Sequence, residues 1–358
     1  MARIVLGAGT SHSPMLSIPG ESWSDYAVTE GRRDDLVYPP EGVLLSYGDG
    51  VKHSAALLKD RPRAVSDHVA QAARCRVALR ALADDFATVK PDIVVMISDD
   101  QEEWFYDNNM PMFSIFWGPS VPIVPRPPVG DLSPELNALI AAGYGDVPMD
   151  VPVAQDLATH LLSYLVEHDF DMAHSAYLDD EYGGRTSRRL PTGTGVADLV
   201  RQRKKRRQGL PHGFSFVVKN LLGNTPHPIV PISQNTCYPP NSASPRRSYA
   251  FGRAVGQAIL EWDSDATVAV VASGGLSHFV TDEEFDRLLL QALERGDADA
   301  LSSLPRHRLY SGTSESLNWV SVAAAMSAAD KRFELIDYVA VYRTDAGTGG
   351  GWAFGRWR

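Results

Sequence analysis

The stretch PDIVVMIS, residues 91–98, is apolar and rich in β-branched residues, and it runs from a proline to a serine. A short continuous apolar run between turn-forming residues is typical of a strand that is covered on both faces. The next residues, Asp99, Asp100, Gln101, Glu102 and Glu103, are all acidic or amide residues. In open α/β sheets ligands bind beyond the carboxyl ends of the strands. The stretch therefore predicts both a central strand and a polar site at its end.

Similar apolar runs recur along the chain and alternate with segments that have the spacing of amphipathic helices. The predicted strands are ARIVLGA (2–8), MFSIFWG (112–118), HPIVPIS (227–233) and ATVAVVAS (266–273). The predicted helices span residues 65–86, 156–169, 245–263 and 282–297. This alternation indicates an α/β fold: a single domain over residues 1–358 with a mostly parallel central sheet flanked by helices.

Two stretches interrupt this pattern and are predicted to be insertions, at residues 18–64 and 178–211. Long loops in compact domains are often lids over a site or excursions on the surface. The second insertion contains the basic run RQRKKRR (201–207), with Arg185, Arg188 and Arg189 before it. This run is either a solvated loop or a contact for a nucleic acid, another subunit or an anionic substrate. The glycine-rich end, YRTDAGTGGGWAFGRW (342–357), either covers a pocket or forms an edge strand and a tail.

The overall composition excludes several classes of protein. The chain has 358 residues and a formal net charge of −10, which argues against a protein that mainly binds nucleic acid. It contains no run of the ~18–20 apolar residues that a membrane-spanning helix needs, and its start lacks the pattern of a secretory signal. Cys75 and Cys237 form no disulfide framework and no CxxC motif. The sequence thus predicts a cytoplasmic protein with no membrane partner.

Polar groups that can do chemistry follow most of the predicted strands. They are His12 after the first strand, Asp99 to Glu103 after the second, Gln234 and Asn235 after the fourth, and His278, Glu283 and Glu284 after the fifth. One such histidine is usually a structural residue, but histidines and carboxylates at several strand ends together indicate a metal or acid/base site. Imidazole and carboxylate without thiolate suit divalent iron, manganese or zinc. No GxGxxG, GxSxG or P-loop motif is present.

A resemblance to a known family appears when these motifs are taken in order. IVLGAGTSHSP, IVVMISDDQ, PHGFSF, SGGLSHF with DEEFD, and SESLNW are similar to the class III extradiol ring-cleavage dioxygenases of the protocatechuate 4,5-dioxygenase β-subunit type. The likeness covers most of the chain outside residues 18–64 and 178–211. It implies non-haem Fe(II), bound by two histidines and a glutamate, and a catechol-type substrate that is cleaved with O₂.

The resemblance also implies roles for single residues. His12 matches the first histidine ligand and Glu284 matches the glutamate ligand. His278 matches the acid/base histidine, and His212 matches a second histidine near the substrate and oxygen. Glu315 and Asn318, in SESLNW, are candidates for contact with the substrate, as is Asn235.

The sequence departs from the family at the second histidine ligand, where it has Gln101. A glutamine carbonyl oxygen can coordinate divalent iron or manganese, although it is a weaker donor than imidazole. Asp99 or Asp100 could take this place, or the site could have lost its iron. We expect the metal to be retained, with Gln101 as the third ligand.

The expected function is Fe(II)-dependent ring cleavage beside the two hydroxyls of a carboxylated aromatic such as protocatechuate, gallate or methylgallate. A homo-oligomer is expected. Two other readings stay open: a metal-dependent hydrolase with His278 as its acid/base group, and a non-catalytic relative that binds an aromatic acid.

Overall fold

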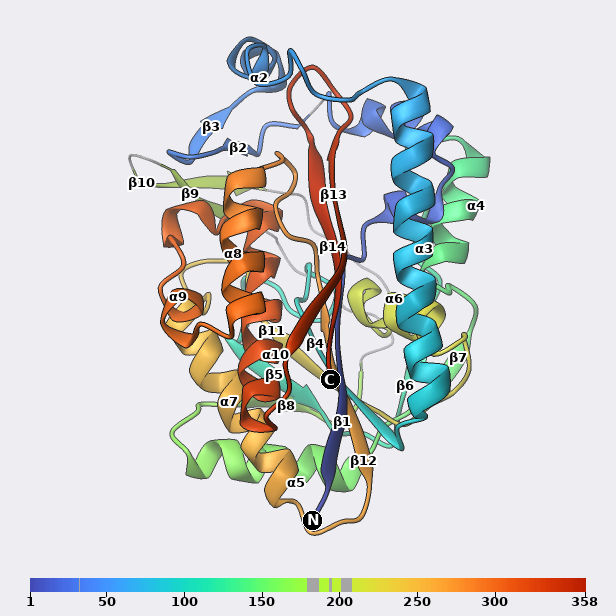
Figure 1. Cartoon of the computed structure of the whole chain (residues 1–358), viewed down its shortest axis with the longest axis vertical. Helices are drawn as coiled ribbons and strands as arrows, with labels where there is room; N and C mark the ends of the chain where they lie inside the picture. The colour runs from blue at the N-terminus through green and yellow to red at the C-terminus, as the bar shows by residue number, and fades with distance from the viewer. Residues whose placement is uncertain (32, 179–186, 193–194, 201–207) are drawn as a thin grey trace.

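The computed structural model describes residues 1–31, 33–178, 187–192, 195–200 and 208–358. Within them, one eight-stranded sheet forms the centre of the molecule, in the order β13-β14-β1-β12-β4-β11-β5-β8 (Figure 1). The strands are β1 (Arg3–Thr10), β4 (Ile93–Ser98), β5 (Phe113–Phe116), β8 (Ala173–Ser175), β11 (Ile229–Gln234), β12 (Thr267–Ser273), β13 (Phe333–Tyr342) and β14 (Gly349–Trp357). All five strands expected from the apolar runs are present, and the fold is the predicted α/β domain.

The four central strands, β1, β12, β4 and β11, are parallel neighbours. Every residue of β4 and β11 is buried, as their continuous apolar runs predict. Because the strands run in the same direction, Thr10, Ser98 and Ser273 end them at one edge of the sheet. The residues that follow these ends are therefore brought together, whatever their separation in the sequence.

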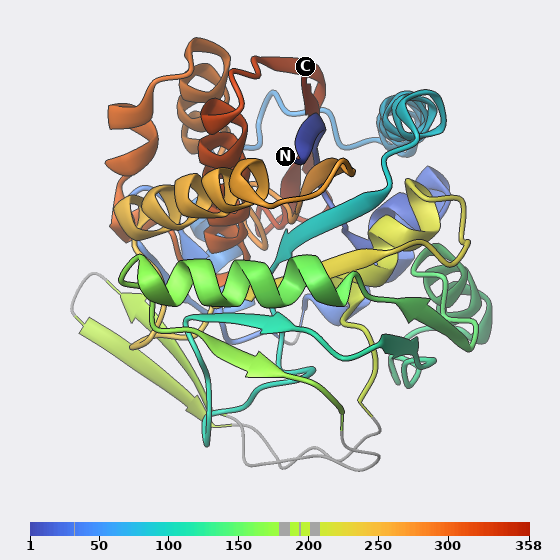
Figure 2. The same ribbon diagram turned by 90° about the horizontal axis from the view of Figure 1, so that it is seen from below.

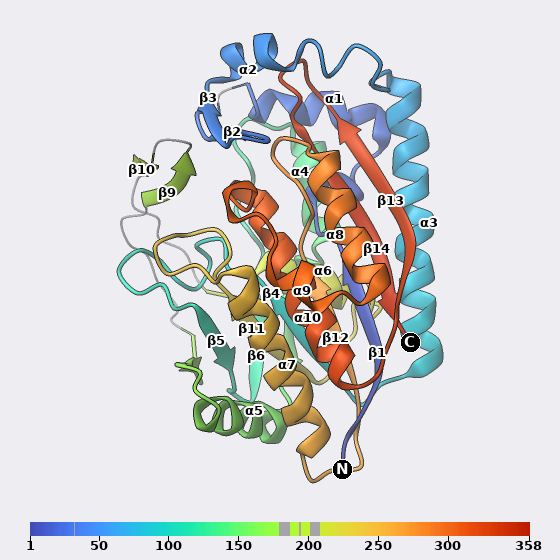
Figure 3. The same cartoon turned by 60° about the vertical axis from the view of Figure 1, so that its left-hand side comes forward.

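Helices cover both faces of the sheet. The bounds are α3 (Val65–Val89), α5 (Gln155–Glu167), α6 (His212–Asn220), α7 (Pro245–Glu261), α8 (Glu283–Arg295), α9 (Ala298–Ser302) and α10 (Ser316–Ala328). Helix α10 packs against β1, β4, β12 and α7, whereas α3 and α6 contact each other and the opposite face. Figure 2 shows α3 and the orange and red helices on opposite sides, and Figure 3 places α7, α8 and α10 in front of the strands.

Side-chain caps mark the first residues of two of the predicted helices, α7 and α8. The Ser244 side chain accepts a hydrogen bond from Arg247 N, and Pro245 occupies the first turn of α7. Asp282 caps α8 in the same way through Phe285 N. One face of α7 then buries Phe251, Val255 and Ile259 in the core. No helix among the described residues is both long and apolar enough to cross a lipid bilayer.

The C-terminal segment forms an antiparallel hairpin of β13 and β14. Strand β14 also pairs with β1 and lies inside the sheet, which leaves β13 at the edge. Helices α3 and α8 pack against β13. Residues Gly349 and Trp352 of β14 line the main cavity, so the segment also contributes to the pocket wall.

The first insertion folds into short elements above the carboxyl ends of the strands (Figure 1). They are η2 (Gly20–Ser22), α1 (Trp23–Tyr26), η3 (Ala27–Thr29), β2 (Leu36–Tyr38), β3 (Val43–Leu45) and α2 (Tyr47–Ser54), and η1 (Pro14–Ser17) directly precedes the insertion. Leu36 and Tyr38 pack against Val280, close to His278 in the chain. Tyr26, Thr29 and Glu30 line the main cavity, so this insertion contributes to its wall.

The second insertion is described only in part, as the hairpin of β9 (Ser187–Thr192) and β10 (Gly195–Val200). The basic run 201–207 and Arg185 lie outside the described residues, and only the backbone of Arg188 and Arg189 is described, within β9. The remaining elements are α4 (Pro134–Gly143), a hairpin of β6 (Ser120–Ile123) and β7 (Met149–Pro152), and η4 (Arg306–Arg308) and η5 (Ser311–Glu315) before α10.

Candidate metal centre and active site

His12 follows β1 and is held in one tautomer by Ser273, the last residue of β12. Its Nδ1 lies 3.0 Å from Ser273 Oγ, and that hydroxyl donates its own proton to Gly213 O at 2.7 Å. Ser273 Oγ must therefore accept a proton from His12 Nδ1, which leaves Nε2 with a free lone pair. Burial lowers the pKa of His12 to about 3, so the ring is neutral at ordinary pH.

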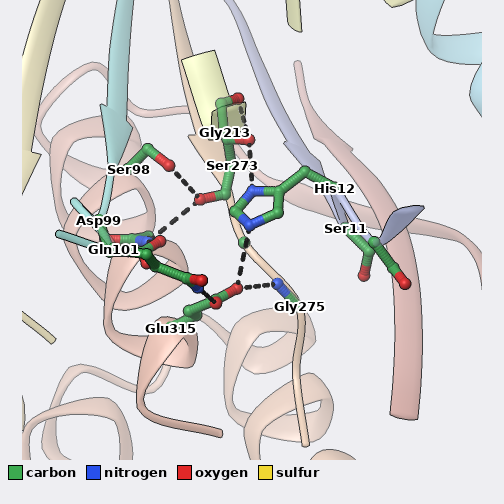
Figure 4. Close-up of polar contacts among 12 residues, drawn as sticks. Ser11, His12, Ser98, Asp99, Gln101, Gly213, Ser273, Gly275 and Glu315 are labelled. Carbon is green, nitrogen blue, oxygen red and sulfur yellow. Dashed lines mark hydrogen bonds and ion pairs between the residues drawn. The ribbon is translucent and has the colours of Figure 1, made fainter. Parts of the chain in front are cut away.

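Glu315 reaches the same place from the end of η5, directly before α10. Its Oε2 lies 3.4 Å from His12 Nε2 and accepts a hydrogen bond from Gly275 N at 2.8 Å (Figure 4). Its Oε1 accepts a hydrogen bond from Gln101 Nε2 at 2.6 Å. Burial raises the pKa of this carboxyl group, but His278 and His12 beside it outweigh that effect and lower the pKa to about 2. Glu315 is therefore a buried carboxylate.

Asp99, the first residue after β4, completes the group. Its Oδ2 is buried and makes no hydrogen bond with the described residues. Its Oδ1 lies 3.5 Å from Asn318 Nδ2. Burial, and then the charge of Glu315, raise the pKa of Asp99 well above its usual value. The potential ligand atoms of His12, Asp99 and Glu315 all lie within 4.8 Å of one another.

This arrangement fits a divalent cation. The lone pair of His12 Nε2 faces a carboxylate oxygen of Glu315, and two such acceptors repel each other unless a proton or a metal ion lies between them. Asp99 adds an oxygen that has no partner, which is costly for a buried polar atom. One imidazole and two carboxylates are a donor set that suits divalent iron or manganese.

The side chains of Gln101 and Asp100 make hydrogen bonds that differ from those expected of metal ligands. Gln101 lines the cavity, but it presents its amide nitrogen to Glu315 and so helps to orient that carboxylate. The carboxylate of Asp100 accepts hydrogen bonds from Glu103 N, Trp104 N and Phe105 N. Asp100 therefore stabilises the turn after β4, and Asp99 is the group with an unpartnered oxygen in the cluster.

His278 lies on the other side of Glu315. Its Nδ1 is 3.0 Å from Leu276 O, and its Nε2 is 3.1 Å from Glu315 Oε1. Burial lowers the pKa of His278, but the adjacent Glu315 outweighs it, and the net shift is upward. A Cβ atom at Gly312 would come within 2.0 Å of the His278 ring, so only glycine allows this approach.

His212, the first residue of α6, lies against His12 with the two ring centroids 4.7 Å apart. Its Nδ1 makes a short contact with Glu103 Oε1. The structure therefore brings together His12, His212, His278, Gln101 and Glu315 of the predicted site, and all five line one cavity of about 820 Å³. A volume of this size is typical of a small-molecule site.

The structure does not bring Glu284 to this cavity. Its side chain is 83% exposed on the first turn of α8, where it pairs with Arg308 Nη1 at 3.1 Å. The carboxylate beside His12 is that of Glu315, which the sequence suggested as a substrate contact. This is a correction to the predicted ligand set, and its cause is the packing of α10 over the strand ends.

The other predicted substrate contacts lie behind the cavity wall. Asn235 Nδ2 donates to Tyr238 O at 2.8 Å and to Asn241 O at 2.9 Å, so its side chain stabilises its own loop. Asn318 is fully buried and donates to Ser273 O at 3.1 Å. Neither residue lines the cavity, and Asn318 contributes through its contact with Asp99.

Two neighbours of His12 were not predicted from the sequence: Ser273, and Tyr144, whose hydroxyl donates to His12 O at 3.0 Å. Glu103, beside His212, is one of the acidic residues noted after strand 91–98, but its partner was not predicted. Glu103 and Ser273 follow or end predicted strands, and that position is a usable signal. Tyr144 follows α4 and gives no local signal, because only the tertiary structure brings it to His12.

The chain is similar in sequence to proteins that are named as dioxygenases. The chain is 29% identical over 205 residues to a protein of Mycobacterium sp. (strain MCS) named 2,3-dihydroxyphenylpropionate/2,3-dihydroxicinnamic acid 1,2-dioxygenase, a match that covers 55% of this chain and 47% of the relative. A protein of the same name from Xanthobacter autotrophicus (strain ATCC BAA-1158 / Py2) is 27% identical over 203 residues, which is 56% of this chain and 48% of the relative. The chain thus spans about half the length of the curated relatives it matches.

A family profile covers much more of the chain than these pairwise matches do. The profile described as the catalytic LigB subunit of aromatic ring-opening dioxygenase matches residues 59–350. This range includes β4, β11, β12 and α10, together with Asp99, Gln101, His212, His278 and Glu315. The chain therefore belongs to the family of the catalytic LigB subunit of aromatic ring-opening dioxygenases.

Proposed function

We propose that this chain is a metal-dependent extradiol dioxygenase that cleaves the ring of a catechol-type substrate with O₂. The observation that carries the proposal is the buried group of His12, Asp99 and Glu315. His12 and Glu315 of this group line a cavity together with His278 and His212. Family membership and the names of the matched relatives support the same chemistry.

His12, Asp99 and Glu315 would hold the metal, which we propose to be Fe(II). The bound ion would supply a Lewis-acid and redox centre at which a catechol and O₂ react. Within the chain, Ser273 keeps Nε2 of His12 free, and Gly275 N and Gln101 hold Glu315 in orientation. Such contacts fix the ligands before the metal arrives.

His278 is proposed to carry the proton that a catechol hydroxyl loses on binding. Its Nδ1 is bound to Leu276 O, so Nε2 is the nitrogen that exchanges protons. That nitrogen lies 3.1 Å from Glu315 Oε1, at the edge of the metal group. When Nε2 no longer donates to Glu315 Oε1, it can accept a proton from the substrate and return it after the ring opens.

A carboxylated substrate is favoured by one donor on the cavity wall. Arg343 lines the cavity, and its buried Nε makes no hydrogen bond with the described residues. Its Nη2 pairs with Glu30, which fixes the guanidinium in place. An arginine on the cavity wall suits the carboxylate of a dihydroxylated aromatic acid.

Anaerobic loading with Fe(II), followed by O₂ and a panel of catechols, tests the proposal. We expect O₂ uptake and a yellow ring-opened product, with faster turnover of substrates that carry a carboxylate. Metal-free protein is the control. Absence of O₂ uptake with every catechol and gallate in the panel would refute the dioxygenase, and turnover of an ester or amide without O₂ would indicate the hydrolase.

Replacement of Gln101 by histidine tests the departure from the family's ligand set. We expect Gln101→His to bind Fe(II) about 10-fold or more tightly, because an imidazole beside Asp99 and Glu315 is a stronger donor than an amide. Calorimetric titration of the metal-free protein measures the affinity directly. The paired variant Asp99→Asn removes a proposed ligand and should weaken binding; unchanged affinity in Asp99→Asn would remove Asp99 from the ligand set.

A further inference from the structure

We propose that Glu103 is a positioning residue that holds His212 in a single tautomer, with Nδ1 protonated and Nε2 free to meet the substrate. The role of His212 toward a catechol rests on the proposed function, whereas its contact with Glu103 does not. The contact itself is a property of the chain. Glu103 belongs to the run DDQEE (99–103), in which Asp99 is the proposed metal ligand.

Two contacts tie one oxygen of Glu103 to His212. Glu103 Oε1 accepts a hydrogen bond from the backbone N of His212 at 3.0 Å, and it makes a short contact with Nδ1 of the same ring. A carboxylate has no proton to give, so Nδ1 must be the donor. His212 is also the first residue of α6, and a carboxylate is favoured at the N-terminus of a helix.

The other oxygen of Glu103 is held by Arg126. Arg126 Nε lies 3.4 Å from Glu103 Oε2, and its Nη2 donates to Leu210 O at 2.9 Å and to Ser215 Oγ at 3.0 Å. Arg126 also pairs with Asp146. The Arg126 guanidinium thus connects Glu103 to the start of α6. It also places a positive charge beside Oε2, the carboxylate oxygen that does not contact His212. The side chain of Glu103 is only 9% exposed, so these contacts are little screened by water.

The ring of His212 is also fixed by its neighbours. The Tyr144 ring lies edge-on to it with centroids 5.5 Å apart, and His12 lies at 4.7 Å in a similar arrangement. Tyr144 in turn donates its hydroxyl proton to His12 O. With Nδ1 bound to Glu103, Nε2 is the nitrogen left for the cavity that His212 lines. There it can accept a hydrogen bond from a substrate hydroxyl.

Glu103→Gln is a sharp test, because glutamine cannot replace both contacts. If its carbonyl oxygen faces His212, its NH₂ group faces the Nε–H of Arg126. If it is turned over, the NH₂ group faces the backbone N–H of His212. Either way two donors oppose each other. In the first orientation Nδ1 keeps only a neutral amide oxygen in place of the carboxylate, and in the second it loses its acceptor altogether.

The direct readout is the tautomer of His212, measured by ¹H–¹⁵N NMR on histidine-labelled protein loaded with diamagnetic Zn(II). We expect a protonated Nδ1 in the wild type and a mixture of tautomers in Glu103→Gln. Glu334→Gln is the matched control, because Glu334 on β13 also pairs with an arginine but its side chain is 54% exposed. Glu103→Leu removes every acceptor at this position, and a wild-type tautomer retained in both Glu103→Gln and Glu103→Leu would overturn the proposal, whether or not the protein turns over catechols.

Kinetics of the Fe(II) enzyme provide the second readout. We expect Glu103→Gln to lower kcat about 10-fold or more, with a normal circular dichroism spectrum. In a His212→Gln background the same change should have no further effect, because Glu103 acts through His212. An equal further loss in that background would show that Glu103 supports the fold, and it would contradict the positioning role.

Discussion

Glu315→Gln protein is expected to bind Fe(II) more than about 100-fold more weakly than the wild type. Removal of a residue that only orients a ligand lowers metal affinity by up to roughly 100-fold, and loss of a ligand itself should lower it further. Glu315 is the buried carboxylate whose Oε2 lies 3.4 Å from the free nitrogen of His12. Glutamine has nearly the same shape but replaces the negative charge with a neutral amide. Metal affinity of the purified protein, measured by calorimetry or by competition with a chelator, tests this expectation.

Glu284→Gln is the matched control for this experiment. Glu284 is also a glutamate close to the start of a helix, but its side chain is 83% exposed and pairs with Arg308. We expect it to leave metal affinity and turnover unchanged. The reverse result, with metal lost in Glu284→Gln and kept in Glu315→Gln, would restore the ligand set inferred from the sequence and contradict the one proposed from the structure.

His278→Gln is expected to lower kcat by about 10²–10⁴-fold while metal affinity stays close to that of the wild type. His278 contacts Glu315 Oε1 at 3.1 Å, but it does not belong to the group formed by His12, Asp99 and Glu315. Its loss removes the proton carrier and leaves the metal group in place. Steady-state O₂ uptake, with metal content measured on the same samples, separates the two effects.

His160→Gln is the control for loss of a histidine elsewhere in the fold. His160 lies on α5, contacts Ala258 O at 2.9 Å and does not line the cavity. It should leave kcat unchanged. If His278→Gln lost its metal together with its activity, His278 would be a ligand, and the acid/base role would have to be assigned to another residue.

The central strands and long helices of this protein could be predicted because their signals are local. A short, β-branched apolar run such as 266–273 is typical of a strand that is buried on both faces. The C-terminal hairpin was harder to predict, because its glycines indicate a loop when only the sequence is read. Gly351 shows why they are there: a Cβ atom at this position would come within 1.8 Å of Asp286 Oδ2. That close approach exists only in the folded chain.

The same distinction applies to the proposed ligands. The places of His12 and Asp99 follow from the sequence, because each comes just after a buried strand and the ends of neighbouring parallel strands converge at one edge. Glu284 and Glu315 look alike in the sequence, since both are acidic residues close to the start of a helix. Helix α10 packs over β1, β4 and β12 and carries Glu315 to the strand ends, whereas the first turn of α8 turns Glu284 toward solvent. Burial depends on contacts between segments far apart in the chain, so the choice between these two carboxylates was made by tertiary packing.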